Sequence, residues 1–228
     1  MRSMNLSHAD EILDAAEHIP EGATLIVQQV SWDDYERLLD GIGDRQHFRV
    51  SYDCGRLEIL SPSNRHEKPI RFFDRLVSEF SRIRKITVEM LGHTTWKKRA
   101  LAKGLEADCC YFIKNADFSI KNFGFDVELA PPPDVAVEID ITNSSLRKLS
   151  IYAALSVPEV WRYDGRNVRI YELIGEKYSE IDSSRFLPGL TGSILGEFLE
   201  LAATIGQTKA LEKFSRRLRR TRSGFPRR

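Results

Sequence analysis

The sequence predicts an α/β protein in which a central mixed β-sheet is flanked by helices. Three observations predict this class. Strand-like and helix-like segments take turns along the chain, neither an internal repeat nor a linker divides it, and 228 residues with a 42% hydrophobic fraction suit one good-sized core. We therefore expect a single α/β or α+β domain with short terminal appendages.

The N-terminal part is predicted to contain a short helix, a capped helix and a hairpin. Pro20 and Gly22 end the first segment, and Ser31 stands where a helix N-cap belongs, with acidic residues in the first turn. The turn Asp53-Cys54-Gly55 separates two β-rich runs, as in a hairpin. In order, we expect an arm or helix over 1–22, a strand over 24–30, a helix over 32–39 and strands over 47–52 and 56–60.

A long amphipathic helix is predicted next. Ile70, Phe73, Val77 and Phe80 recur at spacings of three and four, which is the buried stripe of such a helix. Prolines at 131–133 stop any helix before the following strand. After the long helix we expect strands over 86–91, 105–113, 127–129 and 134–142, a helix over 146–155, a hairpin of 159–163 and 168–174, extended residues over 178–181 and a C-terminal helix over 192–218.

Charge is distributed unevenly along the chain. The 34 basic and 33 acidic residues nearly cancel, but residues 214–228 hold seven arginines and no acidic residue. Such a basic end either contacts phosphate backbones or is a solvated terminus, and composition leaves both interpretations open. We divide the chain into an N-terminal arm (1–22), a main domain (23–205) and a basic C-terminal helix or tail (206–228).

Composition disfavours several classes of protein. No apolar run approaches the roughly 18 residues of a membrane span, and the acidic N-terminal segment does not fit a secretory signal. The three cysteines, Cys54, Cys109 and Cys110, fit neither a disulfide framework nor a zinc site. We expect a cytoplasmic protein that does not contact a membrane.

The segment 134–142 carries the clearest chemical signal. It alternates strictly, so that Asp134, Glu138 and Asp140 share one strand face while valines and isoleucines point to the core. Neighbouring carboxylates about 6–7 Å apart repel one another unless a cation lies among them, and Mg²⁺ prefers such oxygen ligands. The alternative is a strand face exposed to water, although acidic residues are poor strand formers.

The strand over 105–113 supplies a second carboxylate. Asp108 lies in its middle, again against strand propensity. One face is predicted to carry Glu106, Asp108, Cys110 and Phe112, and the core-facing set is Leu105, Ala107, Cys109, Tyr111 and Ile113. Alone, this aspartate fits a structural role as well as a functional one.

Two helices supply further candidates. Lys148 falls in the first turns of the helix after Glu138, where the helix dipole disfavours a cation, and Tyr152 follows on the same face. Glu67 shares the buried stripe of the long helix, so it either points inward or completes a capping box with Asn64. A surface lysine is the alternative for Lys148.

A basic cluster lies in the middle of the chain. Lys97, Lys98, Arg99 and Lys103 follow Trp96 just before the strand of Asp108, and they are candidates for contacts with DNA phosphates. A solvated loop is the alternative. Since no base-reading motif is present, the sequence indicates no specificity.

Several stretches together resemble a known family. YDCGRLEILSPSNRHE, then GLEADCCYFI, then PPPDVAVEIDITNSSLRKLSIYAALSVPEVWRYDG resemble the Uma2 family of restriction-endonuclease-like proteins. The resemblance covers about residues 25–200. EIDITNSS, with a lysine four residues before a tyrosine, resembles the branch abundant in cyanobacteria.

The resemblance implies the PD-(D/E)XK nuclease core. In that core an aspartate and a glutamate on neighbouring strands bind the metal, and a lysine assists the attacking water. The matching positions here are Asp108, Glu138 and Lys148, with Glu67 as the acidic residue at the start of a helix. The usual lysine position, two residues after the glutamate, holds Asp140, so the resemblance places the lysine on the following helix.

The resemblance thus implies a Mg²⁺-dependent endonuclease (Mn²⁺ is an alternative ion) that hydrolyses phosphodiester bonds in DNA. Asp134, Asp140 and Tyr152 would support the metal ligands. The alternatives are a nucleic-acid-binding module of the same fold with weak or no turnover, and an enzyme acting on RNA or a small phosphoester. A homodimer is expected because related nucleases pair to cut both strands, and the hairpin at 159–174 offers an edge.

Overall fold

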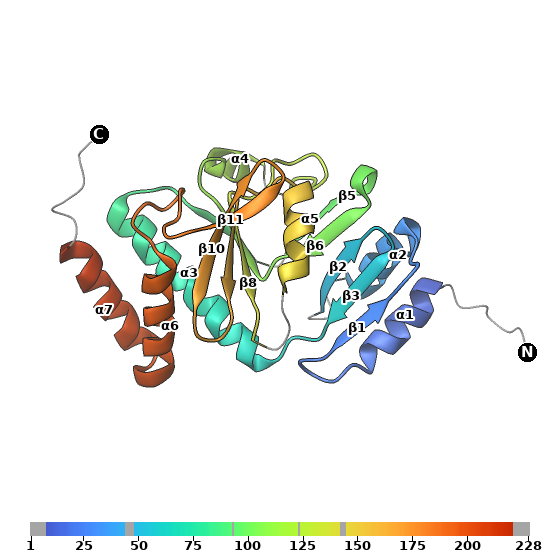
Figure 1. Ribbon diagram of the computed structural model, residues 1–228, viewed down its shortest axis with the longest axis horizontal. Helices are drawn as coiled ribbons and strands as arrows, with labels where there is room; N and C mark the ends of the chain where they lie inside the picture. The colour runs from blue at the N-terminus through green and yellow to red at the C-terminus, as the bar shows by residue number, and fades with distance from the viewer. Residues whose placement is uncertain (1–7, 44–47, 93, 123, 142–144, 221–228) are drawn as a thin grey trace, which may run out of the picture.

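A computed structural model describes residues 8–43, 48–92, 94–122, 124–141 and 145–220, which form two β-sheets flanked by helices (Figure 1). The mixed α/β class is confirmed, but the strands are divided between two sheets where the sequence predicted one. Within the described residues, no helix combines the length and the apolar character needed to cross a membrane.

The first sheet has five antiparallel strands in the order β1-β3-β2-β6-β5. Helices α1 and α2 pack against it and bury Ile12, Tyr35 and Leu38 together with Val50 and Leu57 of the sheet. The elements of this part are α1 (His8–Glu17), β1 (Thr24–Val27), α2 (Trp32–Ile42), β2 (Arg49–Asp53), β3 (Arg56–Leu60), β5 (Thr95–Lys98) and β6 (Lys103–Glu106).

The second sheet has six strands in the order β11-β10-β9-β8-β7-β4. Strands β8 and β9 run parallel, and the other described neighbours run antiparallel. The elements of this part are α3 (Asn64–Arg84), β4 (Glu89–Leu91), β7 (Cys109–Phe112), α4 (Ala116–Lys121), β8 (Val135–Ile139), α5 (Lys148–Ala154), β9 (Glu159–Tyr163), β10 (Val168–Ile174), β11 (Lys177–Ile181), α6 (Gly192–Ile205) and α7 (Gln207–Arg220).

Both faces of β7 and β8 are covered. Cys109 and Tyr111 join a core formed with α3, α6 and α7, as the predicted alternation required. Cys110 and Phe112 point to the opposite face, where they join a second core with Tyr152 of α5. The alternation was therefore right for residues 109–112, although the second face of β7 is buried apolar surface because a helix packs there as well. It was wrong for Leu105 and Ala107, which were predicted on the face of Cys109 and Tyr111 but join the core of Cys110 and Phe112.

Three predicted elements differ most from the structure. The predicted strand 105–113 is interrupted at Ala107 and Asp108, where the chain passes from the first sheet to the second. Residues 127–129 form a turn instead of a strand, and the polar stretch before them contains α4. The predicted helix 192–218 is divided into α6 and α7 at Gly206, whose φ of +87° is a left-handed conformation that glycine adopts without strain.

Candidate functional site

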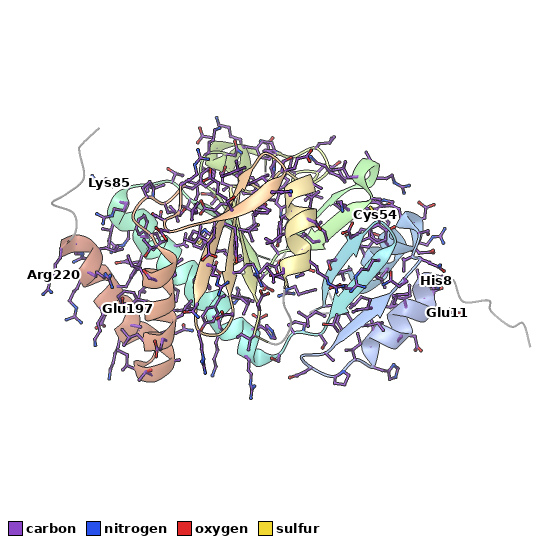
Figure 2. All side chains as sticks on the ribbon, in the orientation of Figure 1. His8, Glu11, Cys54, Lys85, Glu197 and Arg220 are labelled. Atoms are coloured by element: carbon purple, nitrogen blue, oxygen red, sulfur yellow. The ribbon has the colours of Figure 1, made fainter. Side chains whose placement is uncertain are left out.

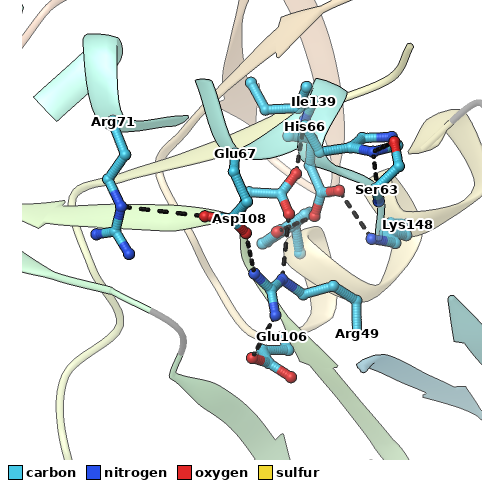
Figure 3. Close-up of polar contacts among 11 residues, drawn as sticks. Arg49, Ser63, His66, Glu67, Arg71, Glu106, Asp108, Ile139 and Lys148 are labelled. Atoms are coloured by element: carbon cyan, nitrogen blue, oxygen red, sulfur yellow. Dashed lines mark hydrogen bonds and ion pairs between the residues drawn. The ribbon is translucent and has the colours of Figure 1, made fainter. Parts of the chain in front are cut away.

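The candidate site lies where the chain crosses from one sheet to the other. Glu106 ends β6, Asp108 follows in the interruption, and Glu138 lies near the end of the adjacent strand β8. Arg49 on β2 and Glu67 on α3 complete the cluster (Figure 3). The site is therefore built from both sheets and from the start of the long helix.

Glu138 is the most enclosed carboxylate of the site, with 2% of its surface exposed. Lys148 Nζ donates to Glu138 Oε2 at 2.7 Å, and the Tyr152 hydroxyl donates to Oε1. Both donors lie on α5, four residues apart, so one turn of the helix presents them on one face. The structure thus brings together the glutamate, lysine and tyrosine that the sequence singled out.

Asp108 is held by one contact from each side. Its Oδ2 accepts the Ile139 backbone N–H at 2.7 Å, which ties it to the strand that carries Glu138. Its Oδ1 accepts from Arg49 Nε at 3.3 Å, which ties it to the first sheet. Only 6% of the residue is exposed.

Arg49 was not identified from the sequence. Its buried guanidinium lies within 3.5 Å of three carboxylates: 3.3 Å from Asp108, 3.4 Å from Glu106 and 3.5 Å from Glu67. The sequence gives only a weak indication of its role, because Arg49 is an arginine in a predicted hairpin strand, on the face opposite Val50. Burial of a charge in such a strand requires partners, but the sequence does not say which ones.

Glu67 points toward this cluster and does not cap its helix. Ser63 is the N-cap of α3, and its backbone N–H donates to His66 Nδ1 at 3.2 Å in a capping box. The predicted box of Asn64 and Glu67 is therefore wrong by one residue. Glu67 instead lies 3.5 Å from Arg49 and 4.0 Å from the exposed Arg71.

Acidic groups outnumber basic groups in the interior of the site. Burial raises the pKa of Glu138 to about 7, Lys148 opposes this rise, and Asp108 adds to it. Burial also raises the pKa of Glu106 to about 7, although Arg49 opposes the rise. Arg49 and Lys148 thus leave negative charge uncompensated, which a divalent cation would offset.

These pKa shifts predict that the metal-free protein loses stability as pH rises from about 4.5 to 7. The folded state keeps protons on Glu106 and Glu138 up to about pH 7, whereas in the unfolded chain they leave near the ordinary value of 4.5. Between these pH values the folded state binds more protons than the unfolded chain. The stability that these two protonated glutamates contribute is therefore fully present below pH 4.5 and is lost as the pH rises through 7. Urea unfolding in EDTA should show this fall in the free energy of unfolding. In Glu106→Gln the fall should be smaller by up to about 3 kcal/mol. A profile that Glu106→Gln leaves unchanged would contradict the prediction.

A cavity gives access to the carboxylates. Asp108, Glu138 and Lys148 line a volume of about 40 Å³, enough for a few water molecules. A larger pocket of about 310 Å³ adjoins it and shares Ser51, Glu58 and Lys148 with it. A substrate can thus approach the buried carboxylates from the side of Lys148.

Asp108 and Glu138 are the carboxylates of this cavity that could hold a metal. Among the described residues, no group of three or more His, Cys, Asp or Glu side chains is arranged to hold an ion. Mg²⁺ commonly takes only one or two protein carboxylates and keeps several waters. Asp108 and Glu138, on the wall of the same small cavity, match that requirement.

Asp134 and Asp140 have structural partners. Asp134 Oδ2 accepts the backbone N–H groups of residues 113, 114 and 115 at 2.7, 2.8 and 3.2 Å. It precedes β8, about 13 Å along the strand from Glu138. Asp140 accepts the Ser145 backbone N–H at 2.9 Å and pairs with Arg162. Asp134 is thus remote from the site, whereas Asp140 holds the Ser145 backbone three residues before Lys148.

The basic cluster around Trp96 is engaged by acidic side chains. Lys97 Nζ lies 2.8 Å from Glu36, Arg99 lies 2.5 Å from the same glutamate, and Lys103 pairs with Asp53. Lys98 is half-buried on β5. The structure does not bring these four residues to Asp108, and three of them already have anionic partners.

Comparisons with known proteins agree with the resemblance found in the sequence. Residues 32–204 match the model of the Uma2 family, described as "Putative restriction endonuclease". No curated protein matches the chain. One similar solved structure is the "Crystal structure of a putative nuclease belonging to DUF820 from Anabaena variabilis ATCC 29413", which is 14% identical. The match covers 65% of this chain and 89% of that chain, with a TM-score of 0.46, so it carries no further argument.

The family match spans most of the chain, including the whole second sheet, four of the five strands of the first sheet and every carboxylate of the site. The chain belongs to the Uma2 family.

Proposed function

We propose that the protein is a Mg²⁺-dependent endonuclease that hydrolyses phosphodiester bonds in DNA. The observation that carries the proposal is the convergence of Asp108, Glu138 and Lys148 on one small cavity that opens into a larger pocket. Family membership supports the nuclease class. The charge balance of the site supports a divalent cation.

Asp108 and Glu138 would hold the metal. When bound, Mg²⁺ (or Mn²⁺) would polarise the phosphodiester and lower the pKa of a bound water. Ile139 N–H and Arg49 fix the orientation of Asp108, and Tyr152 fixes that of Glu138. These contacts keep the ligands in place before a metal arrives, which reduces the cost of ordering them.

Lys148 would act on the reacting groups themselves. Its ammonium lies 2.7 Å from Glu138 and also lines the larger pocket, so it lies between the metal ligands and the approach route of the substrate. A fixed positive charge there would stabilise the charge that develops on the phosphate and favour the deprotonated form of an attacking water. Nearby buried carboxylates keep the pKa of Lys148 above its ordinary value despite the opposing effect of burial, so the side chain remains charged at neutral pH.

The test is cleavage of supercoiled plasmid, with single-stranded DNA, RNA and a small phosphodiester as parallel substrates. We expect nicking of DNA in Mg²⁺ or Mn²⁺ and none in EDTA. Metal binding, followed by calorimetry, should occur without substrate. Binding of DNA without cleavage would favour a binding module of the same fold, and cleavage restricted to RNA or the small diester would replace the proposed substrate.

Lys148→Met is expected to reduce the cleavage rate by about 100- to 1,000-fold, since it removes a charge fixed next to the reacting phosphate. Binding of Mn²⁺ by calorimetry should persist, because both carboxylates remain. Lys148→Arg keeps the charge and should retain more activity than Lys148→Met. Equal rates for wild type and Lys148→Met would exclude the assigned role.

A further inference from the structure

Helix α7 is strongly basic on its exposed side. Its exposed charged residues are Lys209, Glu212, Lys213, Arg216, Arg217, Arg219 and Arg220. Four of the basic side chains, Lys213, Arg216, Arg217 and Arg220, line one shallow concavity of about 510 Å³. They follow the spacing i, i+3, i+4, i+7, so one helix face carries them as an α7 basic stripe.

The energetics of an isolated helix disfavour this stripe. Each like-charge pair at i, i+3 or i, i+4 costs a helix about 0.2–0.5 kcal/mol. The helix dipole favours cations in the last turn, which covers Arg217 and Arg220, but not Lys213 one turn earlier. Arg217 also has structural contacts, because it pairs with Glu197 at 2.5 Å and lies over the Phe198 ring. An external polyanion would offset the repulsion among these cations.

The stripe is far from the candidate site. Helix α7 runs beside α3, with Gln207 contacting Lys68 and Ser215 contacting Glu79. Glu67 of the site lies twelve residues before Glu79, about 18 Å along the helix. Figure 2 shows Arg220 and Glu197 at one end of the molecule, with Cys54 and His8 toward the other.

We propose that the α7 basic stripe binds the phosphodiester backbone of nucleic acid and anchors it away from the candidate site. The proposal rests on the proposed function in one respect, which is the choice of nucleic acid as the polyanion. Closely spaced cations on a rigid helix suit a backbone of regularly repeated negative charges, and the contact needs no base recognition.

The apolar side of α7 argues against a membrane as the partner. A basic amphipathic helix on a bilayer inserts its apolar face. Here Ala210, Phe214 and Leu218 are at most 3% exposed, and Phe214 packs against Phe198 with ring centroids 5.0 Å apart. None of the exposed large hydrophobic residues in the described part of the chain lies on α6 or α7. The helix therefore presents charge to its surroundings without an anchor for lipid.

The test compares two triple variants of the full-length protein. Lys213→Gln/Arg216→Gln/Arg220→Gln removes three stripe charges but keeps Arg217. The control, Lys114→Gln/Lys121→Gln/Lys177→Gln, removes three exposed lysines from other elements. Fluorescence anisotropy with duplex and single-stranded oligonucleotides is measured in EDTA at several salt concentrations, so that no cleavage contributes.

We expect the stripe variant to bind at least about tenfold more weakly at 0.1 M salt and to lower the log–log salt slope by about two to three. The control should change both much less. Equal losses of oligonucleotide affinity in the two variants would overturn the proposal. A stripe variant that binds oligonucleotides like the wild type but binds phosphatidylserine vesicles more weakly would also overturn it. If the stripe variant binds more weakly but the wild type does not cleave DNA with metal, the proposed nuclease activity is rejected and the role of the stripe stands. If the wild type cleaves DNA but the stripe variant binds as well as the wild type, the role of the stripe is rejected and the nuclease activity stands.

Discussion

Glu138→Gln is expected to reduce metal-dependent cleavage by more than about 100-fold. Substitutions that only remove support from a metal ligand already cost about 10- to 100-fold, so loss of a ligand charge should cost more. Glutamine keeps the size of the side chain and an oxygen that can accept from Tyr152. Cleavage and Mn²⁺ binding should therefore fall together while the fold persists.

Glu159 offers a matched control for this substitution. It is also a fully buried glutamate in the second sheet, and burial raises its pKa in the same direction. Its carboxylate accepts from Trp161 Nε1 and from the Arg185 backbone N–H at 2.9 Å, away from Lys148. Glu159→Gln should keep metal binding and cleavage. If both glutamine variants behaved alike, loss of activity would reflect damage to the sheet and not loss of a ligand.

Arg49→Met is expected to destabilise the metal-free protein by about 3–5 kcal/mol at pH 7.5. Its guanidinium faces Asp108, Glu106 and Glu67, and its removal leaves buried carboxylates without their cation. Urea unfolding followed by circular dichroism measures the loss. It should shrink toward pH 5, because Glu106, with its pKa raised to about 7, is then protonated.

Arg56→Met is the comparison for Arg49→Met. Arg56 lies on the neighbouring strand β3 and pairs with Glu58 at 2.6 Å, but its side chain is 27% exposed. Water compensates such a pair, so the expected cost is only about 0–1 kcal/mol. If Arg49→Met cost no more than Arg56→Met, the guanidinium would not be the cation that stabilises the cluster.

The part of the site that local periodicity defines could be predicted from the sequence. Alternation along one strand singled out Glu138, and helical spacing put Lys148 and Tyr152 on one face. The structure joins these three by direct contacts, since each pattern operates within a few residues. The same alternation suggested Asp134, which lies remote from the site, because a shared strand face says nothing about distance along the strand.

The contribution of Arg49 could not be predicted in this way. It depends on the pairing of β2 with β6, where Ser51 lies opposite Leu105, more than fifty residues later in the chain. The division into two sheets has a similar origin. Residues 105–113 carry no turn signal, and the division appears only in the strand pairing, where Leu105 lies opposite Ser51 of β2 but Cys109 lies opposite Val137 of β8.

The position of the site on the crossing between the sheets would link the proposed catalysis to relative motion of the two sheets. Each sheet has its own core, and a third cluster joins Trp96 and Leu105 of the first sheet to Phe112 of the second. The carboxylates of the crossing are held by Arg49 from one side and by Ile139 and Lys148 from the other. A relative rotation of the two halves would separate these groups and would break the cluster that joins the sheets, but it would leave the other two cores intact. Partial opening at this seam therefore costs less free energy than global unfolding. On warming, the protein should become inactive while both halves still retain their secondary structure and hydrogen-exchange protection.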